Sequence, residues 1–413
     1  MSNKSETVYK IVHIELEEPL PEVAVPSGYS GLGCVVRRNG KPVGYFMEAI
    51  AGDTILSPRD IAARIMNHTA SFILAEKIRD ELLGRQIVSQ LPTLDIAICT
   101  HDRPDTLQRC LRSLRECGLM DRSGKVRVLV IDNAPTGGQT RLLVEDFPNV
   151  VYVLEPKPGL DFARNRAVRE STAELLAFLD DDVIIDRCWL EGLQEAWTEN
   201  PDAGAFTGPV LPLELETRAQ ILFEEMGGFG RSFWRTRFGS VLPGLPTYPC
   251  GAGMFGAGCN MVFRRAALLR LGGFDDALDT GAPLPGGGDL DMFYRVVRGG
   301  YPLIREPKLV VYHQHRREYA KLRHQMWTWG LGSMAFVTKS WRTDLTERAK
   351  IGRWALWWLS FQLSKILTPY LRRTRKPWPW DLVMAEVAGG AVGLFGEYGR
   401  SQKRIELLRR QHT

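Results

Sequence analysis

The sequence predicts an α/β protein in which residues 91–320 form a central domain around a mostly parallel β-sheet with flanking helices. Three observations lead to this prediction. From Leu94 onward, short apolar runs alternate with helix-like stretches, which is the pattern of βαβ units with right-handed crossovers. Polar residues follow the end of each apolar run. The run Leu175–Leu179 is entirely apolar, as expected for a strand buried on both faces, and it leads directly into the three carboxylates Asp180–Asp182.

Residues 1–90 precede this domain and have the composition of a small α+β module. The stretches Val8–Leu16, Leu32–Arg37 and Val43–Glu48 have strand-like composition. In the stretch Arg59–Leu83 the apolar residues recur in helical phase, so we expect a helix there. No catalytic pattern is visible in this module.

The central domain begins with strands and helices in alternation. The expected order is strand Leu94–Cys99, helix Pro104–Cys117, strand Val126–Ile131, helix Gly138–Phe147, strand Val150–Leu154, helix Leu160–Glu170 and strand Leu175–Leu179. Ligands bind beyond the carboxyl ends of the strands in such sheets. We therefore expect a ligand site to include polar residues that follow these strands, namely Thr100, Asp102, Arg103, Asp132 and Asp181. For Asp102 and Asp132, capping of the next helix is an open alternative.

The acidic triplet is the strongest local signal of chemistry. Alternate side chains of an extended chain share a side, so Asp180 and Asp182 are expected to point together. Carboxylates this close raise each other's pKa unless a cation lies among them, and the hard ions Mg²⁺ and Mn²⁺ prefer oxygen ligands. The alternative is an acidic turn followed by a helix, Arg187–Glu199, that Asp186 caps.

A second candidate for anion binding lies at the start of the predicted helix Leu160–Glu170. Lys157, Pro158 and Gly159 lead into this helix, and Arg164 and Asn165 follow within its first turns. A helix N-terminus with an arginine nearby suits a pyrophosphate, because both the dipole and the guanidinium attract negative charge. The alternative is a solvated basic helix face.

Four of these stretches together resemble glycosyltransferase family 2, a group of nucleotide-sugar transferases with the GT-A fold, which is Rossmann-like. They are Leu94–Pro104, Val130–Asn133, Gly159–Asn165 and Phe178–Asp182, in the family's order, and the resemblance covers residues 92–320. It implies that Asp180 and Asp182 hold a metal ion on the diphosphate of the donor. It also implies that the sugar is transferred with inversion at the anomeric carbon.

The second half of the central domain is expected to supply the acceptor side. Gly251–Gly256 spells GxGxxG, but the Pro-rich stretch before it cannot be a central strand, so we reject a dinucleotide fingerprint. The stretch Phe255–Met261 resembles the Gly-x-x-Asn strand of the family, which implies Gly258 and Asn260 in the sugar pocket. For Asn260, a buried structural amide is an open alternative.

The glycine run Gly286–Gly288 precedes the candidate general base, Asp289. An acid beside a mobile loop is suited to take the proton from an acceptor hydroxyl. The family usually has Glu-Asp here, and this chain has Gly288 and Asp289, so only the second acid matches. Asp291 is the reserve candidate, and a helix cap is the alternative role of Asp289.

Two histidines follow the predicted strand Leu309–Tyr312. Period-two spacing places His313 and His315 on one side, and many GT-A enzymes use a histidine near this point as a metal ligand. We expect His313, with His315 in reserve, to complete the site of Asp180 and Asp182. The alternative is a histidine packed over the end of the sheet.

Residues 321–413 are expected to be helical, rich in tryptophan and basic. Trp327 and Trp329 lie in a Gln-x-x-aromatic helix that resembles one in related polymer-forming enzymes, where they would stack on sugar; core packing is the alternative. The apolar helix Trp354–Leu371 is too short in its charge-free part to span a bilayer, so we expect it to lie in the membrane plane or to dock on the protein's own core.

The seven cysteines form no CxxC pair and the N-terminus has no apolar signal, so we expect reduced thiols and a cytoplasmic protein, peripheral on the cytoplasmic membrane face. The function expected is metal-dependent inverting glycosyl transfer, with Mn²⁺ or Mg²⁺. The donor is a nucleotide-diphosphate sugar and the acceptor a glycan or lipid-linked hydroxyl, in polysaccharide or glycolipid assembly. The rivals are nucleotidyl transfer on the same fold and a non-catalytic membrane scaffold. No recognition motif supports nucleic-acid binding.

Overall fold

The central domain is built on one eight-stranded sheet. The computed structural model describes residues 8–84, 92–122, 124–242, 244–281, 283–371 and 378–411. The strand order across the sheet is β13 (Thr236–Phe238), β15 (Leu303–Arg305), β11 (Ala205–Thr207), β14 (Asn260–Arg264), β9 (Leu175–Asp180), β6 (Leu94–Thr100), β7 (Val126–Asn133) and β8 (Val150–Glu155). Six of these strands run in one direction, and β14 and β13 run against them. The predicted mostly parallel α/β sheet is confirmed.

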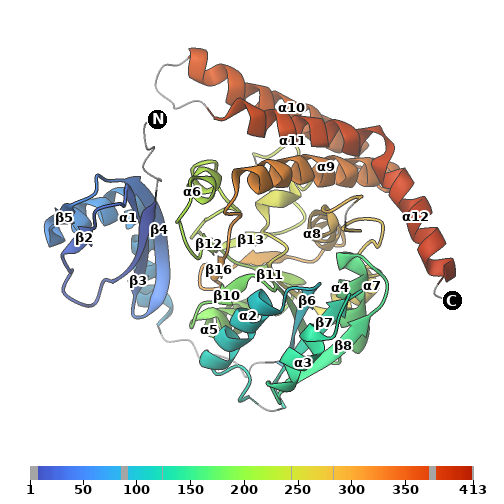
Figure 1. Cartoon of the computed structure of the whole chain (residues 1–413), viewed down its shortest axis with the longest axis horizontal. Helices are drawn as coiled ribbons and strands as arrows, with labels where there is room; N and C mark the ends of the chain where they lie inside the picture. Colours follow the sequence, from blue (N-terminus) through green and yellow to red (C-terminus); the bar gives the residue numbers. More distant parts are fainter. Residues whose placement is uncertain are drawn as a thin grey trace.

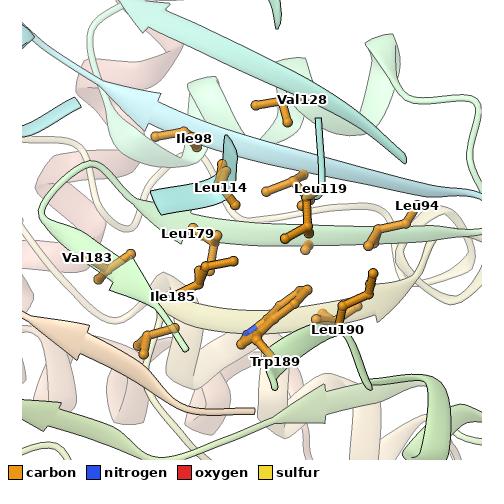
Figure 2. Close-up of a cluster of buried hydrophobic side chains, with 14 of the residues drawn as sticks. Leu94, Ile98, Leu114, Leu119, Val128, Leu179, Val183, Ile185, Trp189 and Leu190 are labelled. Carbon is orange, nitrogen blue, oxygen red and sulfur yellow. The ribbon is translucent and has the colours of Figure 1, made fainter. Parts of the chain in front are cut away.

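The expected alternation of strands and helices from Leu94 onward is also confirmed. The helices between the parallel strands are α2 (Pro104–Glu116), α3 (Gln139–Glu145) and α4 (Leu160–Glu170). Every side chain of β9 up to Leu179 is buried, and hydrophobic clusters pack on both faces of the sheet. Figure 2 shows part of one cluster, to which Leu179, Trp189 and Leu190 belong. Burial on both faces explains why this strand is apolar throughout.

The register of these strands brings their carboxyl ends together. Thr100 of β6 pairs with Asp132 of β7, and Cys99 pairs with Asp180 of β9. A small second sheet follows, with the order β10 (Val183–Ile185), β16 (Val311–His313) and β12 (Val210–Pro212). In it, Val183 is the antiparallel partner of His313. This pairing places the histidine directly beside the acidic triplet.

The N-terminal residues form a sheet of β1 (Tyr9–Glu15), β3 (Gly31–Arg38) and β4 (Lys41–Ala49), which the long helix α1 (Pro58–Leu83) covers. A two-stranded sheet of β2 (Val23–Val25) and β5 (Thr54–Leu56) was not predicted. The helix α1 starts with a capping box, in which Ser57 and Asp60 bond each other's backbone N–H groups.

An arginine joins this module to the central domain. Arg37 forms a buried ion pair with Asp186 and donates to the hydroxyl of Tyr312 at 2.9 Å, and that hydroxyl donates to Asp186 at 2.9 Å. The prediction that Asp186 caps the following helix is wrong, because helix α5 (Trp189–Glu199) begins after Cys188. The carboxylate instead neutralises a guanidinium that arrives from the N-terminal sheet.

The C-terminal helices cover the far end of the central domain in two layers (Figure 1). Helix α9 (Tyr319–Thr343) lies next to the sheet, and α10 (Arg348–Leu371) and α11 (Trp380–Val392) lie outside it, followed by η2 (Gly393–Glu397) and α12 (Tyr398–Gln411). A Cβ atom at Gly330 would collide with the carbonyl of Glu386, so α9 and α11 are in backbone contact. Among the described helices, none has an apolar stretch long enough to cross a membrane.

Candidate functional site

A cavity of about 930 Å³ opens at the carboxyl ends of β6 and β9. This volume is at the upper end of those that bind organic ligands. Its floor includes residues that follow these two strands, and its other walls come from the Gly227–Gly230 loop, the start of helix α8 (Gly288–Arg298), and helices α9 and α11. The predicted site residues that line it are Thr100, Arg103, Arg164, Asp180, Asp181, Asp182, Gly258, Asp289, His313 and Trp329.

Asp180, Asp182 and His313 form one cluster of potential metal ligands. One ligand atom from each lies within 4.8 Å of the other two, and His313 Nε2 is 3.3 Å from Asp182 Oδ1. Burial lowers the pKa of His313 to about 4, so its ring is neutral at pH 7. Burial and the neighbouring carboxylate of Asp182 raise the pKa of Asp180 to about 7. A divalent cation would offset this repulsion.

The histidine is held in one tautomer by a buried chain of hydrogen bonds. Glu224 can only accept, so His315 Nε2 donates to it at 2.9 Å, which leaves His315 Nδ1 as an acceptor. That atom is 3.1 Å from His313 Nδ1, which must then carry the proton. His313 Nε2 is therefore a bare lone pair that faces Asp182 Oδ1, a buried oxygen without a hydrogen-bond donor. Two acceptors facing each other fit a metal ion between them.

This chain of hydrogen bonds corrects the expectation that His315 is the reserve metal ligand. Its side chain is buried and its two ring nitrogens face Glu224 and His313, so it supports the ligand from behind. Phe229 packs edge-on against His313, with ring centroids 4.9 Å apart. Sequence reasoning did not identify Glu224 or the loop that follows it, in which Gly227, Gly228 and Gly230 adopt positive φ.

Replacing His315 with phenylalanine is expected to weaken Mn²⁺ binding by about 10- to 100-fold, because partners that orient a ligating histidine have effects of this size. The measurement is the Mn²⁺ dissociation constant from electron paramagnetic resonance, without substrate. His315→Gln should retain more affinity, since its amide oxygen can still accept from His313. His68→Phe, on the N-terminal helix α1, is the matched control. Equal Mn²⁺ affinity for wild type and His315→Phe would contradict the role of this hydrogen-bond chain in orienting His313.

Arg103 and Arg316 place positive charge next to the acids. Arg103 donates to Asp181 at 2.7 Å and to Asp182 at 3.3 Å, and Arg316 lies 3.8 Å from Asp182. Thr100 donates to Asp181 at 2.7 Å. Asp181 is therefore satisfied by protein groups and orients Arg103. Both arginine side chains keep about 40% of their surface exposed, at 41% and 38%, so they can contact an anion in the cavity.

Two predicted donor-binding acids do not reach the cavity. Asp102 accepts from the backbone N–H and the hydroxyl of Thr136, and Asp132 is fully buried and accepts from the Tyr152 hydroxyl at 2.9 Å. The next residue, Asn133, lines the cavity instead. Its amide donates to the carbonyl of Lys157 and its oxygen accepts from the N–H of Gly159, which joins two strand-end loops.

Arg164 lines the cavity, but its charge is already matched by buried acids. It donates to Asp161 at 2.9 Å and to Asp279 at 3.0 Å, and its side chain is 5% exposed. Asp279 also accepts from the N–H of Gly288, at the start of α8. The prediction that Arg164 neutralises a diphosphate is replaced by a structural role, in which it fixes the loop before Asp289.

Asn165 likewise turns away from the cavity. Its amide nitrogen donates to the carbonyl of Phe274 and to Asp276, and its oxygen accepts from the N–H of Phe274. The start of helix α4 is thus bound to the chain segment 274–279 and not left open for an anion. The prediction of a pyrophosphate site at this helix is corrected accordingly.

Replacing Arg164 with methionine is expected to lower the free energy of unfolding by about 3–5 kcal/mol, because Asp161 and Asp279 would remain buried without their counter-charge. Urea denaturation of both proteins measures this change. Arg166→Met is the matched control on the same helix. Arg166 pairs with Glu170 at the surface, so its loss should cost less than about 1 kcal/mol. Similar losses for the two variants would contradict the structural role of Arg164.

Asp289 also lines the cavity, at the start of helix α8. Its Oδ2 accepts from the N–H of Gly258 at 2.9 Å, and its Oδ1 from the N–H of Leu290 at 2.8 Å. A Cβ atom at Gly258 would lie 2.9 Å from Arg164 and 3.2 Å from Asp289, so a larger residue there would displace these side chains. The carboxylate is only partly buried, and it remains open to the cavity.

The reserve candidate for the base is excluded by its contacts. Asp291 is 1% exposed, and it pairs with Lys339 at 2.5 Å and with Arg295 at 2.7 Å. These contacts join α8 to α9. Asp291 therefore has a structural role in positioning α8.

The structure places the three predicted acceptor residues in different surroundings. Trp329 lines the cavity and packs on Phe223 and Phe229, whereas Trp327 does not line it and stacks on His324. Asn260 is fully buried, where it accepts from Trp189 and donates to the carbonyl of Leu309. The open alternatives of core packing for Trp327 and of a structural amide for Asn260 hold. Polar residues of α9 and α11 that sequence reasoning missed also line the cavity: Gln325, Thr328, Ser333 and Glu386.

Comparison with known proteins shows similarity to a family of glycosyltransferases over part of the chain. Residues 95–271 match the family model described as glycosyl transferase family 2. Succinoglycan biosynthesis protein ExoM of Rhizobium meliloti (strain 1021) is 34% identical over 184 residues, which are 43% of this chain and 54% of that protein. A pre-mycofactocin glycosyltransferase of Mycobacterium tuberculosis (strain ATCC 25618 / H37Rv) is 27% identical over 231 residues, which are 54% of this chain and 43% of that protein. The chain thus spans about half the length of these relatives.

Among solved structures, mannosyltransferase PcManGT from Pyrobaculum calidifontis, in complex with GDP-Man and Mn²⁺, aligns with 81% of this chain and 97% of that chain. The identity is 17% and the TM-score 0.48, a likeness too low to support an inference.

Proposed function

Because residues 95–271 match the model of glycosyl transferase family 2, we propose that this chain is a metal-dependent inverting enzyme. It takes a nucleotide-diphosphate sugar as donor and transfers the sugar to a hydroxyl of a glycan or lipid-linked acceptor. One observation carries this proposal: a single cavity contains a metal-ligand cluster on one wall and an accessible carboxylate, Asp289, on another.

The donor side of the cavity is Asp180, Asp182 and His313, with Arg103 and Arg316 beside them. Bound there, Mn²⁺ or Mg²⁺ would supply a Lewis acid for the phosphate oxygens. The mixed oxygen and imidazole ligands suit Mn²⁺ well. The half-exposed guanidinium groups of Arg103 and Arg316 bind the diphosphate and stabilise the negative charge that develops on it.

Asp289 acts on the acceptor side as the general base. It takes the proton of the acceptor hydroxyl while that oxygen attacks the anomeric carbon from the face opposite the diphosphate. The bond from the anomeric carbon to the phosphate oxygen breaks, and the diphosphate leaves with the electron pair. The N–H groups of Gly258 and Leu290 hold the carboxylate in place for this step.

The acceptor class is inferred from one relative and from the residues that line the cavity. The relative named for succinoglycan biosynthesis supports polysaccharide or glycolipid assembly. Trp329, Gln325 and Thr328 offer a ring face and hydrogen-bonding groups, which suit a sugar or a lipid-linked sugar. We assign the reaction to the cytoplasmic face of a membrane, with the C-terminal helices toward the lipid.

A donor screen tests the proposal. The chain is incubated with UDP-, GDP- and dTDP-sugars in Mn²⁺, in Mg²⁺ and in EDTA, and the released nucleoside diphosphate is measured. At least one donor should be cleaved only with metal, and nuclear magnetic resonance should show an inverted anomeric product with a hydroxyl acceptor. Pyrophosphate release from a nucleoside triphosphate and a sugar phosphate would instead indicate nucleotidyl transfer. Absence of donor binding in the presence of metal would indicate a non-catalytic scaffold.

A further inference from the structure

The outer layer of C-terminal helices has an apolar surface that faces solvent. Its members lie on α10, α11 and η2 and are each at least 38% exposed. We refer to them as the outer apolar face: Leu356, Trp357, Leu359, Phe361, Leu363, Leu367, Trp380, Met384, Val392, Leu394 and Phe395. The stacked rings of Trp357 and Phe361, with centroids 5.3 Å apart, lie within it. Large exposed apolar side chains gathered on one layer mark interaction sites.

The opposite side of the same helices is packed against the rest of the protein. Trp354, Trp358, Leu382 and Val383 are buried against the rest of the protein. Glu386 also points inward and lines the cavity. Gln362 and Lys365 of α10 donate to its carboxylate. The outer apolar face is therefore the side of a well-packed layer that no described part of the chain covers.

Charge is arranged around the outer apolar face and not within it. Between Leu356 and Leu367, the one charged residue is Lys365, which is directed to Glu386. Between Trp380 and Gly396, the charged residues are Asp381, which accepts from the Tyr319 hydroxyl, and the buried Glu386. Basic residues flank the face in the sequence: Arg342, Arg348 and Arg353 before it, Arg372, Arg373, Arg375 and Lys376 between α10 and α11, and Arg400 and Lys403 after it.

Acidic residues near one end of the layer are already paired. Asp344 accepts from Arg298, and Glu397 pairs with Arg400 and Arg404. Arg342, Arg348 and Arg353, at the start of the layer, are exposed. An apolar band with basic residues on its flanks is complementary to a bilayer with anionic headgroups, in which apolar side chains enter the acyl region and basic ones remain at the headgroups.

We propose that the outer apolar face docks on an anionic lipid bilayer, with α10 and α11 lying in the membrane plane. A second copy of the chain is a poorer occupant, because pairing two such faces would bring basic flanks against basic flanks. The same layer lines the cavity through Glu386 and adjoins α9, which carries Trp329. If the proposed function holds, docking brings the cavity next to the membrane and favours a lipid-linked acceptor; the docking itself does not depend on catalysis.

Vesicle binding tests the proposal directly. The full chain is sedimented with vesicles of phosphatidylcholine alone and of phosphatidylcholine with 30% phosphatidylglycerol, at low and high salt. We expect binding to the anionic vesicles that weakens with salt. The double variant Trp357→Ser, Phe395→Ser should bind about tenfold more weakly, since two apolar side chains are lost from the lipid contact. The control is Ile55→Ser, Leu142→Ser, whose side chains are 68% and 65% exposed outside this face.

Further measurements keep the result unambiguous. Arg348→Gln with Arg353→Gln should weaken binding to anionic vesicles only. The variant Asp180→Ala, Asp182→Ala should bind vesicles like the wild type, so docking is separated from metal chemistry. The proposal is overturned if the wild type binds anionic vesicles no better than the Trp357→Ser, Phe395→Ser variant does. It is also overturned if the wild type is a dimer that this variant dissociates, without a change in vesicle binding.

Discussion

Replacing both Asp180 and Asp182 with alanine is expected to reduce donor cleavage by roughly a thousandfold or more, because charge stabilisation by a bound metal is worth several kcal/mol. The rate of nucleoside diphosphate release in saturating Mn²⁺ measures this loss. Mn²⁺ should also stop raising the melting temperature of the variant, since a ligand that is not bound cannot stabilise the fold. Both measurements use the donor identified by the screen.

A fold control accompanies this variant. In chelator it should melt at no lower temperature than the wild type, because burial and the Asp182 carboxylate raise the pKa of Asp180 to about 7, and the substitution removes that repulsion. Asp202→Ala, at an exposed acid paired with Arg237, is the matched control and should keep full activity. A double variant that transfers sugar at the wild-type rate in EDTA would contradict a metal-dependent mechanism.

Replacing Asp289 with asparagine is expected to lower kcat by about 10²- to 10⁴-fold, the usual contribution of a positioned general base. The amide oxygen can still accept from the N–H of Gly258, so the loop should keep its position. Mn²⁺ affinity and the KM for the donor should therefore change little, because Asp289 belongs to neither the metal cluster nor the arginine pair. Steady-state kinetics with acceptor varied, together with Mn²⁺ titration, measure these quantities.

The variant Asp291→Asn tests whether Asp289 or Asp291, both on helix α8, is the general base. Asp291 pairs with Lys339 and Arg295 and is buried, so its substitution should lower the melting temperature. At a temperature where the variant is folded, kcat should remain near that of the wild type. If Asp291→Asn loses kcat while Asp289→Asn keeps it, the assignment of the base is wrong.

Those parts of the site that depend on local order along a strand could be predicted from the sequence. The apolar run of β9 indicated where a buried strand ends, and Asp180 and Asp182 do converge there, although β9 ends at Asp180 and residues 181–182 form a turn. Parallel pairing brought Thr100 to the same sheet edge. These inferences needed only the strand period and the rule that ligands lie beyond the carboxyl ends of strands.

Residues whose roles depend on distant pairings were predicted less well. Arg164 at a helix start suggests anion binding, but Asp279, which neutralises it, lies 115 residues later in the chain. Glu224 lies 91 residues before the histidine that it orients. No local pattern in the sequence specifies such contacts. Similarly, Trp327 and Trp329 are two residues apart on one helix and so face different directions, and only the packing of α9 decides which one meets the cavity.

The contacts between Arg37, Asp186 and Tyr312 bear on whether the central domain is independent of residues 1–90. Tyr312 immediately precedes His313 on β16. Arg37 of the N-terminal sheet therefore contacts the strand that carries His313, through the hydroxyl of the preceding residue. Without residues 1–90, Asp186 would lose its counter-charge and keep only the donors Tyr312 and Cys188. The central domain therefore depends on the N-terminal sheet for part of its buried charge balance, and we expect the two to unfold together.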